Sequence, residues 1–323
     1  MAFYDLRLRR NDQIYEWHQR YGPVVCIAPN EVSVATLEAT REVYGSTSRW
    51  AKSSYFDNFM GYNERSIFAT RPCKEHRERR KLTSAFYHAS TVYKRPEIEA
   101  RIGDRVQAVL HQIRLGQNDI ETSSEADVYS LTDRFALDNI THLVLGPSHC
   151  TQAVERPCEE RQMLQELKYL QLWGQFRLRF PSLFAHLSRI LGMLIPCLSY
   201  LQAEAKLTDW SYRRFANAVS DPALSDSHSL LRHLLEIDHG LEDDKTSPLD
   251  HKFMAAEILD NINAAEATVA VTATYLIWRL SEHPKWQRLR EELRELPVQT
   301  SGLPSSLLSV TQNPGTHGTY LPT

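Results

Sequence analysis

Residues 248–280, PLDHKFMAAEILDNINAAEATVAVTATYLIWRL, predict one long α-helix. A helix start is typically marked by a hydroxyl at the N-cap, a proline at the first helical position and a carboxylate that reaches back to the cap. Ser247, Pro248 and Asp250 supply these three features. Apolar residues then recur at helical spacing, at Phe253, Ile258, Ile262, Val269, Leu276 and Leu280. At about 1.5 Å per residue the helix would be roughly 50 Å long, which is longer than most surface helices.

The rest of the chain predicts a small sheet and further helices. Val24–Ile27 and Val32–Val34 are β-branched runs on either side of the turn Ala28–Glu31, which predicts a two-stranded hairpin. Pro181 is expected to end the helix that precedes it. Helices are predicted over 37–44 (with Gly45 as a left-handed stop), 72–89, 97–113, 127–145, 163–180, 201–219, 228–238 and from Pro284 to about Leu296.

The composition bounds the class of protein. The 323 residues are 42 % apolar and 24 % charged, as in an ordinary soluble globular protein. The formal charge of −3 comes from 37 basic and 40 acidic side chains, which argues against a protein that binds duplex nucleic acid. Five scattered cysteines without a CxxC pair favour reduced thiols. No signal peptide or membrane-spanning stretch is visible, so we expect a cytoplasmic chain without a membrane span.

The character of the sequence changes after Leu296. Residues 297–323 are rich in Pro, Ser, Thr and Gly and have no hydrophobic periodicity, which predicts disorder. No domain boundary is visible before residue 297. We therefore expect one folded domain over 1–296 and a disordered, unrelated tail over 297–323.

One basic cluster carries the first candidate site. The common nucleotide-binding, zinc-protease and serine-hydrolase motifs are absent, and no histidines pair at metal-ligand spacing, so no metal-ligating residue is predicted. His76 and Arg80 lie four residues apart in a predicted helix and therefore share a face. Two such cations suit two carboxylates or phosphates of a buried ligand. A solvated basic face or a stretch resembling a localisation signal would show the same spacing.

The centre of the long helix carries the second candidate. Three small side chains, Ala264, Ala265 and Ala267, leave space beside the helix where a large group could approach. Glu266 and Thr268 add a carboxylate and a hydroxyl at the same place. A threonine hydroxyl within a helix can bond the carbonyl four residues back and open a local water site. Close helix packing through the alanines, with Glu266 facing solvent, is the alternative interpretation.

Taken in order, these features resemble the cytochrome P450 superfamily of haem-thiolate monooxygenases, and most of all its fungal benzoate-hydroxylase and pisatin-demethylase type. The resemblance covers roughly residues 13–296. It implies a mainly α fold, namely the N-terminal and central part of the cytochrome P450 fold with one small β-sheet. The segments that carry it are YGPVVCIAPNEVSVA (21–35), REVYGSTSRWAKSSYFDNF (41–59), SIFATRPCKEHRERRKLTSAFYHAS (66–90), DVYSLTDRFALDNITHLVLG (127–146) and residues 257–296.

The resemblance assigns roles to five residues. His76 and Arg80 match the ends of the family's Trp/His-x-x-x-Arg motif, which implies that they hold the haem propionates. Ala264 and Ala265 match the small pair that lies over the haem. Thr268 matches the threonine that positions water and protons for O–O cleavage. The family's acidic position is occupied by Ala267 here, and Glu266 is displaced from it by one residue.

The family's cysteine-ligand loop, Phe-x-x-Gly-x-Arg-x-Cys-x-Gly, has no counterpart, since no cysteine follows Cys197. Glu291–Arg294 has the family's Glu-x-x-Arg spacing, but it follows the oxygen-binding helix directly and is better explained as a surface pair. The resemblance therefore implies a C-terminally truncated chain that lacks the C-terminal haem-ligand region and is inactive.

The family's reaction inserts one oxygen atom of O₂ into a small apolar organic substrate, with electrons from an NADPH-dependent reductase. The resemblance implies a place in fungal secondary metabolism, a location in the cytoplasm or on the cytosolic face of the endoplasmic reticulum, and substrate choice by the loop around Tyr55–Ile67. The alternative from another class is a non-catalytic helical protein that binds an apolar small molecule or a partner protein.

Overall fold

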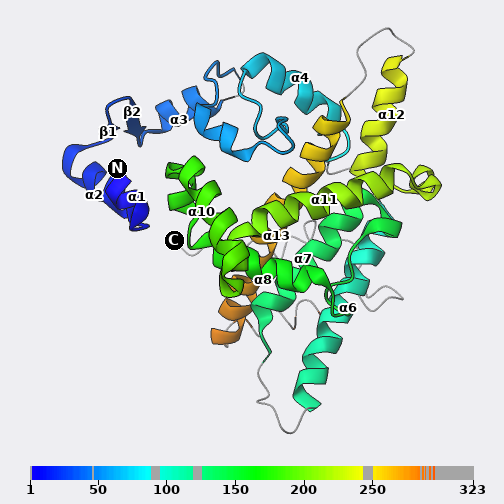
Figure 1. Cartoon of the computed structure of the whole chain (residues 1–323). Helices are drawn as coiled ribbons and strands as arrows, with labels where there is room; N and C mark the ends of the chain where they lie inside the picture. Colours follow the sequence, from blue (N-terminus) through cyan, green and yellow to red (C-terminus); the bar gives the residue numbers. More distant parts are fainter. Residues whose placement is uncertain are drawn as a thin grey trace. The chain divides into compact units, whose positions relative to one another are not determined.

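The longest element of the computed structural model is α13, which runs His251–Glu282 without a break (Figure 1). Its 32 residues confirm the prediction of one long helix that continues through Asn261. The predicted start at Pro248 is wrong, because Asp250 is the N-cap and its carboxylate accepts the backbone N–H of Lys252 at 2.8 Å. The predicted cap, Ser247, lies outside the described residues.

The structure describes residues 2–45, 47–88, 95–118, 126–242 and 250–283, and the single residues 286, 288, 291 and 294. The predicted tail and most of the predicted helix 284–296 lie outside this set. The chain divides into two compact units. The first comprises Met1–Met60, Phe68–Arg77 and Gln162–Leu207, and the second comprises Gly61–Ile67, Glu78–Arg161 and Thr208–Thr323. Within the described residues, no helix combines the length and the apolar run needed to cross a membrane.

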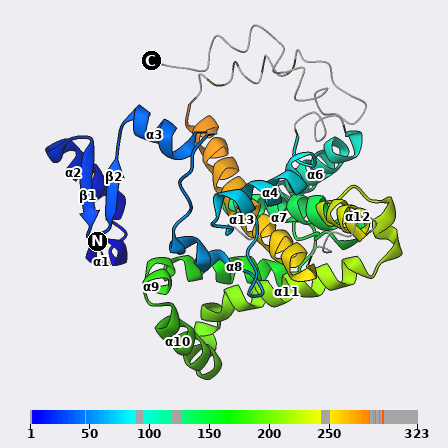
Figure 2. The ribbon, with the colours of Figure 1, turned by 90° about the horizontal axis from the view of Figure 1, so that it is seen from above.

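The second unit is built on the contact between α13 and α7 (Val128–Leu145), which lie side by side in Figures 1 and 2. As predicted, α7 begins after Asp127, whose carboxylate accepts the N–H of Ser130, and ends at Gly146. Gly146 has φ +91°, a conformation that favours glycine, and a Cβ there would lie 3.0 Å from Ser227 Oγ.

Further helices complete this unit. They are α6 (Pro96–Asn118), the 3-10 helices η2 (Pro147–His149) and η4 (Pro222–Asp226), α12 (Leu230–Glu242), and the parts of α4 (Cys73–Ser84), α8 (Glu159–Gln171) and α11 (Ala203–Val219) that fall in it. The core residues Leu137, Leu234 and Ile258 are fully buried. The N-terminal half of α13 is therefore a core helix.

The first unit carries the predicted hairpin. Strands β1 (Val24–Ala28) and β2 (Glu31–Val34) pair antiparallel, with Val24 opposite Val34 and an irregularity between Cys26 and Ala28. A separate core in this unit consists of Leu170, Phe184, Leu201 and Ala203. Its other elements are α1 (Ala2–Leu6), α2 (Arg10–Tyr21), α3 (Leu37–Tyr44), η1 (Ser54–Phe59), α9 (Gly174–Arg179), α10 (Pro181–Leu194) and η3 (Pro196–Gln202).

Two local predictions are wrong, and one helix was not predicted. Gly45 is not left-handed, since its φ is −64°. A Cβ there would instead press on the carbonyl oxygen of Arg41, so close approach explains the glycine. The helix predicted over 163–180 is two helices, α8 and α9. Pro181 starts the unpredicted helix α10, because a proline at the first helical position has no N–H to leave unpaired.

A buried carboxylate on α13 holds the segment Gly61–Ile67. Glu257 is 4 % exposed. Its Oε2 accepts the backbone N–H of Ile67 at 2.9 Å, and its Oε1 accepts the side-chain N–H of Asn261 at 3.2 Å. Arg79 of α4 donates to Glu64 at 3.1 Å and to the carbonyl of Arg65, while its guanidinium lies over the Phe253 ring. These contacts join α4, the segment and α13.

Burial determines the ionisation of Glu257. Loss of hydration raises the pKa of Glu257 to about 7, and the neighbouring charge of Asp260 acts in the same direction. The hydrogen bonds from Ile67 and Asn261 and the charge of Arg79 lower the pKa and offset only part of this rise. Glu257 therefore binds its proton more tightly in the folded chain than in the unfolded chain.

We predict that the free energy of unfolding falls as pH rises from about 5 to about 8, by an amount on the order of a few kcal/mol from Glu257. The unfolded chain releases this proton near the ordinary value of 4.5, whereas the folded chain keeps it up to about 7, so the contribution is lost as pH rises through the folded pKa. Urea unfolding at both pH values should show that Glu257→Gln flattens this dependence. Glu282→Gln, on an exposed part of the same helix, should leave it unchanged. An unaltered dependence in Glu257→Gln would contradict the assignment.

Candidate functional site

The structure places His76 and Arg80 on α4, as predicted. The backbone N–H of His76 bonds the carbonyl of Pro72, so His76 lies in the first turn of the helix, and its side chain is half-buried. Arg80 follows four residues later and is exposed. Residues at this spacing lie on one face of a helix, so both cations project from the same side of α4.

Arg79, the neighbour of Arg80, has a different environment. It is half-buried, its guanidinium lies 4.7 Å from the centroid of the Phe253 ring, and it donates to Glu64. Consecutive residues differ by about 100° around a helix. Arg79 therefore packs α4 against Phe253 of α13, while Arg80 points in another direction and remains exposed.

The centre of α13 presents three of the predicted residues. Ala264 and Thr268 are exposed and Ala265 is half-buried. Thr268 Oγ1 donates to the carbonyl of Ala264 at 2.8 Å, which is the backbone bond expected for a threonine within a helix. Since the hydroxyl proton is used in this bond, the oxygen of Thr268 can still accept a hydrogen bond from outside the helix.

Glu266 lies on another side of the helix. It is half-buried and acts on Tyr129 of α7, whose pKa is raised by burial first and then by the charges of Asp133 and Glu266. The residue between Glu266 and Thr268 is Ala267, which carries no acid. The helix surface around Thr268 therefore receives no carboxylate from either position, and the alternative of Glu266 simply facing solvent does not describe its place beside α7.

The C-terminal half of α13 has an apolar surface that the described part of the chain leaves exposed. Tyr275 is 58 % exposed and Trp278 is 49 % exposed, although both lie within the longest helix. The other large apolar residues of this surface are Val269, Val271, Leu276 and Ile277. Large apolar side chains exposed in this number mark a part of the helix that a partner or ligand covers.

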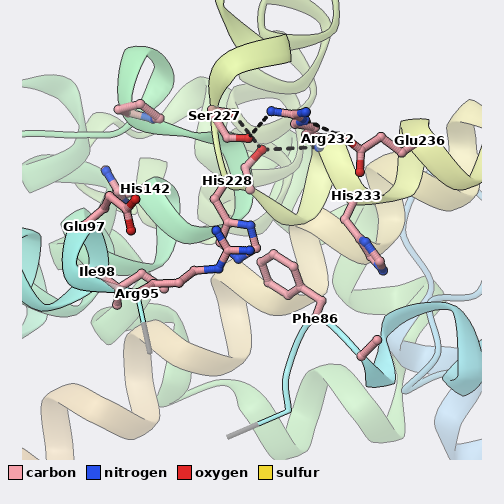
Figure 3. A pocket seen from close by; sticks show the side chains of 13 residues that line it. Phe86, Arg95, Glu97, Ile98, His142, Ser227, His228, Arg232, His233 and Glu236 are labelled. Carbon is pink, nitrogen blue, oxygen red and sulfur yellow. Dashed lines mark hydrogen bonds and ion pairs between the residues drawn. The ribbon is translucent and has the colours of Figure 1, made fainter. Parts of the chain in front are cut away.

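The described residues include no group of three or more histidine, cysteine or acidic side chains that could hold a metal ion. All five cysteines are free thiols. A cavity in the second unit, shown in Figure 3, is lined by none of the five predicted site residues. Sequence reasoning also missed Arg79 and Glu257, because neither residue carries a local signal that distinguishes it from charged neighbours on the same helices.

The comparisons with known proteins agree with this architecture. The model of the cytochrome P450 family matches residues 3–306. The chain is 36 % identical over 308 residues to the cytochrome P450 monooxygenase FGM1 of Gibberella zeae, a match that covers 94 % of this chain and 59 % of the relative. It is 24 % identical over 287 residues to the cytochrome P450 monooxygenase orf2 of Aspergillus niger, with 87 % and 54 % covered.

A shorter match, 40 % identical over 82 residues, links 24 % of this chain to 14 % of the tryprostatin B 6-hydroxylase of Aspergillus fumigatus. The chain spans little more than half the length of its first two relatives. The family match nevertheless extends over most of the 323 residues and includes α4 and α13. The chain belongs to the cytochrome P450 family.

Proposed function

We propose that this chain is the N-terminal and central part of a haem monooxygenase that inserts one atom of O₂ into a small apolar organic substrate. The observation that carries the proposal is the unbroken helix α13, which presents Ala264, Ala265 and Thr268 beside an exposed apolar surface. Haem, when bound, supplies the iron redox chemistry of oxygen activation, while the protein supplies binding, orientation and electrostatics.

The residues present fit a flat, apolar group that carries two carboxylates. The alanine pair leaves room close to the α13 backbone, and the apolar side chains beyond it would exclude water. His76 and Arg80 would donate charge-assisted hydrogen bonds to the two propionates. Thr268 Oγ1 would accept a hydrogen bond from water while its own O–H remains donated to the Ala264 carbonyl. Because position 267 is alanine, the hydroxyl would work with water rather than with a neighbouring acid.

The remaining parts of the reaction come from outside the described residues. In the family the thiolate ligand comes from a C-terminal cysteine loop, and we propose that activity requires it and that these 323 residues alone are inactive. We further propose an NADPH-dependent reductase as the electron donor, a role in fungal secondary metabolism, and a location in the cytoplasm or on the cytosolic face of the endoplasmic reticulum.

A second candidate is a non-catalytic helical protein that binds an apolar small molecule or a partner protein. The exposed apolar surface of α13 favours it, because this surface needs a cover even without haem. Haem uptake discriminates between the two candidates, since only the first requires cations placed for propionates.

We predict that Thr268→Ala leaves the free energy of unfolding unchanged or raises it by up to about 0.5 kcal/mol, because alanine is the better helix former at an exposed site. Thr274→Ala on the same helix should lower the free energy of unfolding by about 1 kcal/mol. Thr274 Oγ1 bonds Thr132 Oγ1 of α7 at 2.7 Å, whereas Thr268 makes no such bond to another helix among the described residues. Denaturant unfolding of both variants checks this, and a large loss in Thr268→Ala would assign Thr268 a structural role.

We predict that a polypeptide of these 323 residues, supplied with haem and then reduced under carbon monoxide, gives no thiolate-type absorption band. None of the five cysteines lies in the family's ligand loop. Absorption spectra of the wild type and of the five single Cys→Ser variants form the measurement. A thiolate-type band that one of these substitutions abolishes would show that the chain uses another cysteine as its axial ligand.

We predict that Arg80→Ala weakens haem uptake by the same polypeptide a few-fold, because a solvent-exposed ion pair contributes modestly. Lys81→Ala removes an equal charge from another side of α4 and should have a smaller effect. Cys26→Ser and Cys197→Ser should have none. Haem titration followed by absorbance gives the affinities, and equal losses in Arg80→Ala and Lys81→Ala would refute a specific propionate contact.

A further inference from the structure

The second unit contains a cavity of about 660 Å³ that the proposed oxygenase chemistry does not use. It lies among the segment after α4, the start of α6, the end of α7 and the start of α12 (Figure 3). Its volume is within the range of small-molecule sites. The histidines that line it are His142, His228 and His233, and the described residues contain no cluster suited to a metal ion.

Two hydrogen-bonding groups in this cavity have no partner among the residues that the structure describes. His228 Nε2 is buried without a hydrogen bond. The Arg95 side chain, which extends toward His228 in Figure 3, makes no hydrogen bond or ion pair with any residue in the described part of the chain. Buried polar groups are normally satisfied, so unpaired groups that converge on a cavity indicate a ligand that would satisfy them.

The neighbouring side chains are held in place and already paired. Phe86 lies between two imidazoles, at 4.9 Å from the His228 ring centroid and 5.7 Å from that of His233 (Figure 3). His233 Nε2 is 2.9 Å from the Leu82 carbonyl oxygen. Arg232 bonds Glu236 at 2.7 Å and the Ser227 carbonyl at 3.1 Å, so the charge of Glu236 is balanced within the protein.

The electrostatics around His228 favour an anion. Burial lowers the pKa of His228, and the charges of Arg95, His233 and Arg232 lower it further, while only Glu97 opposes them. At the other side of the cavity, burial and the charges of Arg101 and Arg105 lower the pKa of His142 to about 4. Both imidazoles therefore bind a proton less readily than a free histidine does, because burial and the nearby positive charges disfavour the charged form.

We propose that this cavity binds an organic anion whose carboxylate or phosphate group lies between the Arg95 guanidinium and the His228 imidazole. Arginine presents a planar fork that matches both groups. Ala85, Ile98 and Pro147 supply apolar wall for the rest of the molecule. None of the predicted haem-facing residues lines the cavity, so the site is separate from the proposed reaction centre and the inference does not depend on it.

The test is calorimetry and His228 ring NMR on the full chain with acetate, phenylacetate, inorganic phosphate and phenyl phosphate. We expect saturable binding of at least one probe, a higher pKa of His228 in the complex, and tighter binding as pH falls from about 8 to about 6. Tighter binding of acetate and phenylacetate would identify a carboxylate site, and tighter binding of inorganic phosphate and phenyl phosphate would identify a phosphate site. Arg95→Gln should weaken binding about tenfold or more, and His228→Gln should abolish the pH dependence.

Arg156→Gln is the matched control, because Arg156 is an exposed arginine of the same unit that does not line the cavity. Amide spectra report whether each variant folds, and Arg95→Lys keeps the charge but loses the fork if Arg95→Gln does not fold. The proposal is overturned if no probe saturates at millimolar concentration, or if Arg156→Gln weakens binding as much as Arg95→Gln does.

Discussion

The burial of the N-terminal half of α13 against α7 is the constraint on which the second unit depends. Ile258 and Ile262 of α13 and Leu137 of α7 are fully buried or nearly so, and Thr132 joins Thr274 farther along the same contact. Because the helix is continuous, its packed half sets the direction in which the C-terminal half extends. The exposed half of α13 thus has a defined position even though the described residues leave its apolar surface open.

The burial pattern of α13 also bears on the predicted cofactor-binding residues Ala264 and Ala265 and the predicted catalytic residue Thr268. Ala264 and Thr268 are exposed and Ala265 is half-buried, so the helix positions them although they contribute little to the core. The methyl side chains of Ala264 and Ala265, and the Thr268 hydroxyl that bonds a carbonyl of its own helix, contribute little to the stability of the fold. This suits their proposed role, which is to leave space and a hydrogen-bond acceptor beside the α13 backbone. Glu266, on the α7 side, belongs to the packing of the two helices rather than to that surface.

A second constraint joins α4 to α13. Arg79 is half-buried and Glu257 is buried. Both side chains hydrogen-bond to the backbone of the segment Gly61–Ile67. The same helix turn then directs Arg80 away from the core. The proposed haem-binding cation is therefore positioned by its neighbour, whose contacts are structural. Glu257 thus attaches this segment to α13 through a carboxyl group whose pKa burial raises to about 7.

The elements with strong local signals could be predicted from the sequence: the hairpin around Pro29, the uninterrupted α13, and α7 between Asp127 and Gly146. The placement of His76 and Arg80 on α4 and of Thr268 on α13 was predicted in the same way. Hydrophobic periodicity, helix caps and motif spacing depend on residues close together in the chain, so the sequence is enough to detect them. The predicted tail and last helix fall outside the described residues and stay predictions. Four features could be read only from the folded chain: Pro181 begins a helix, Arg79 packs while Arg80 stays exposed, Glu257 is buried, and Arg95 and His228 line one cavity. These outcomes depend on burial and on contacts between segments far apart in the chain, and such contacts leave no pattern in the local sequence.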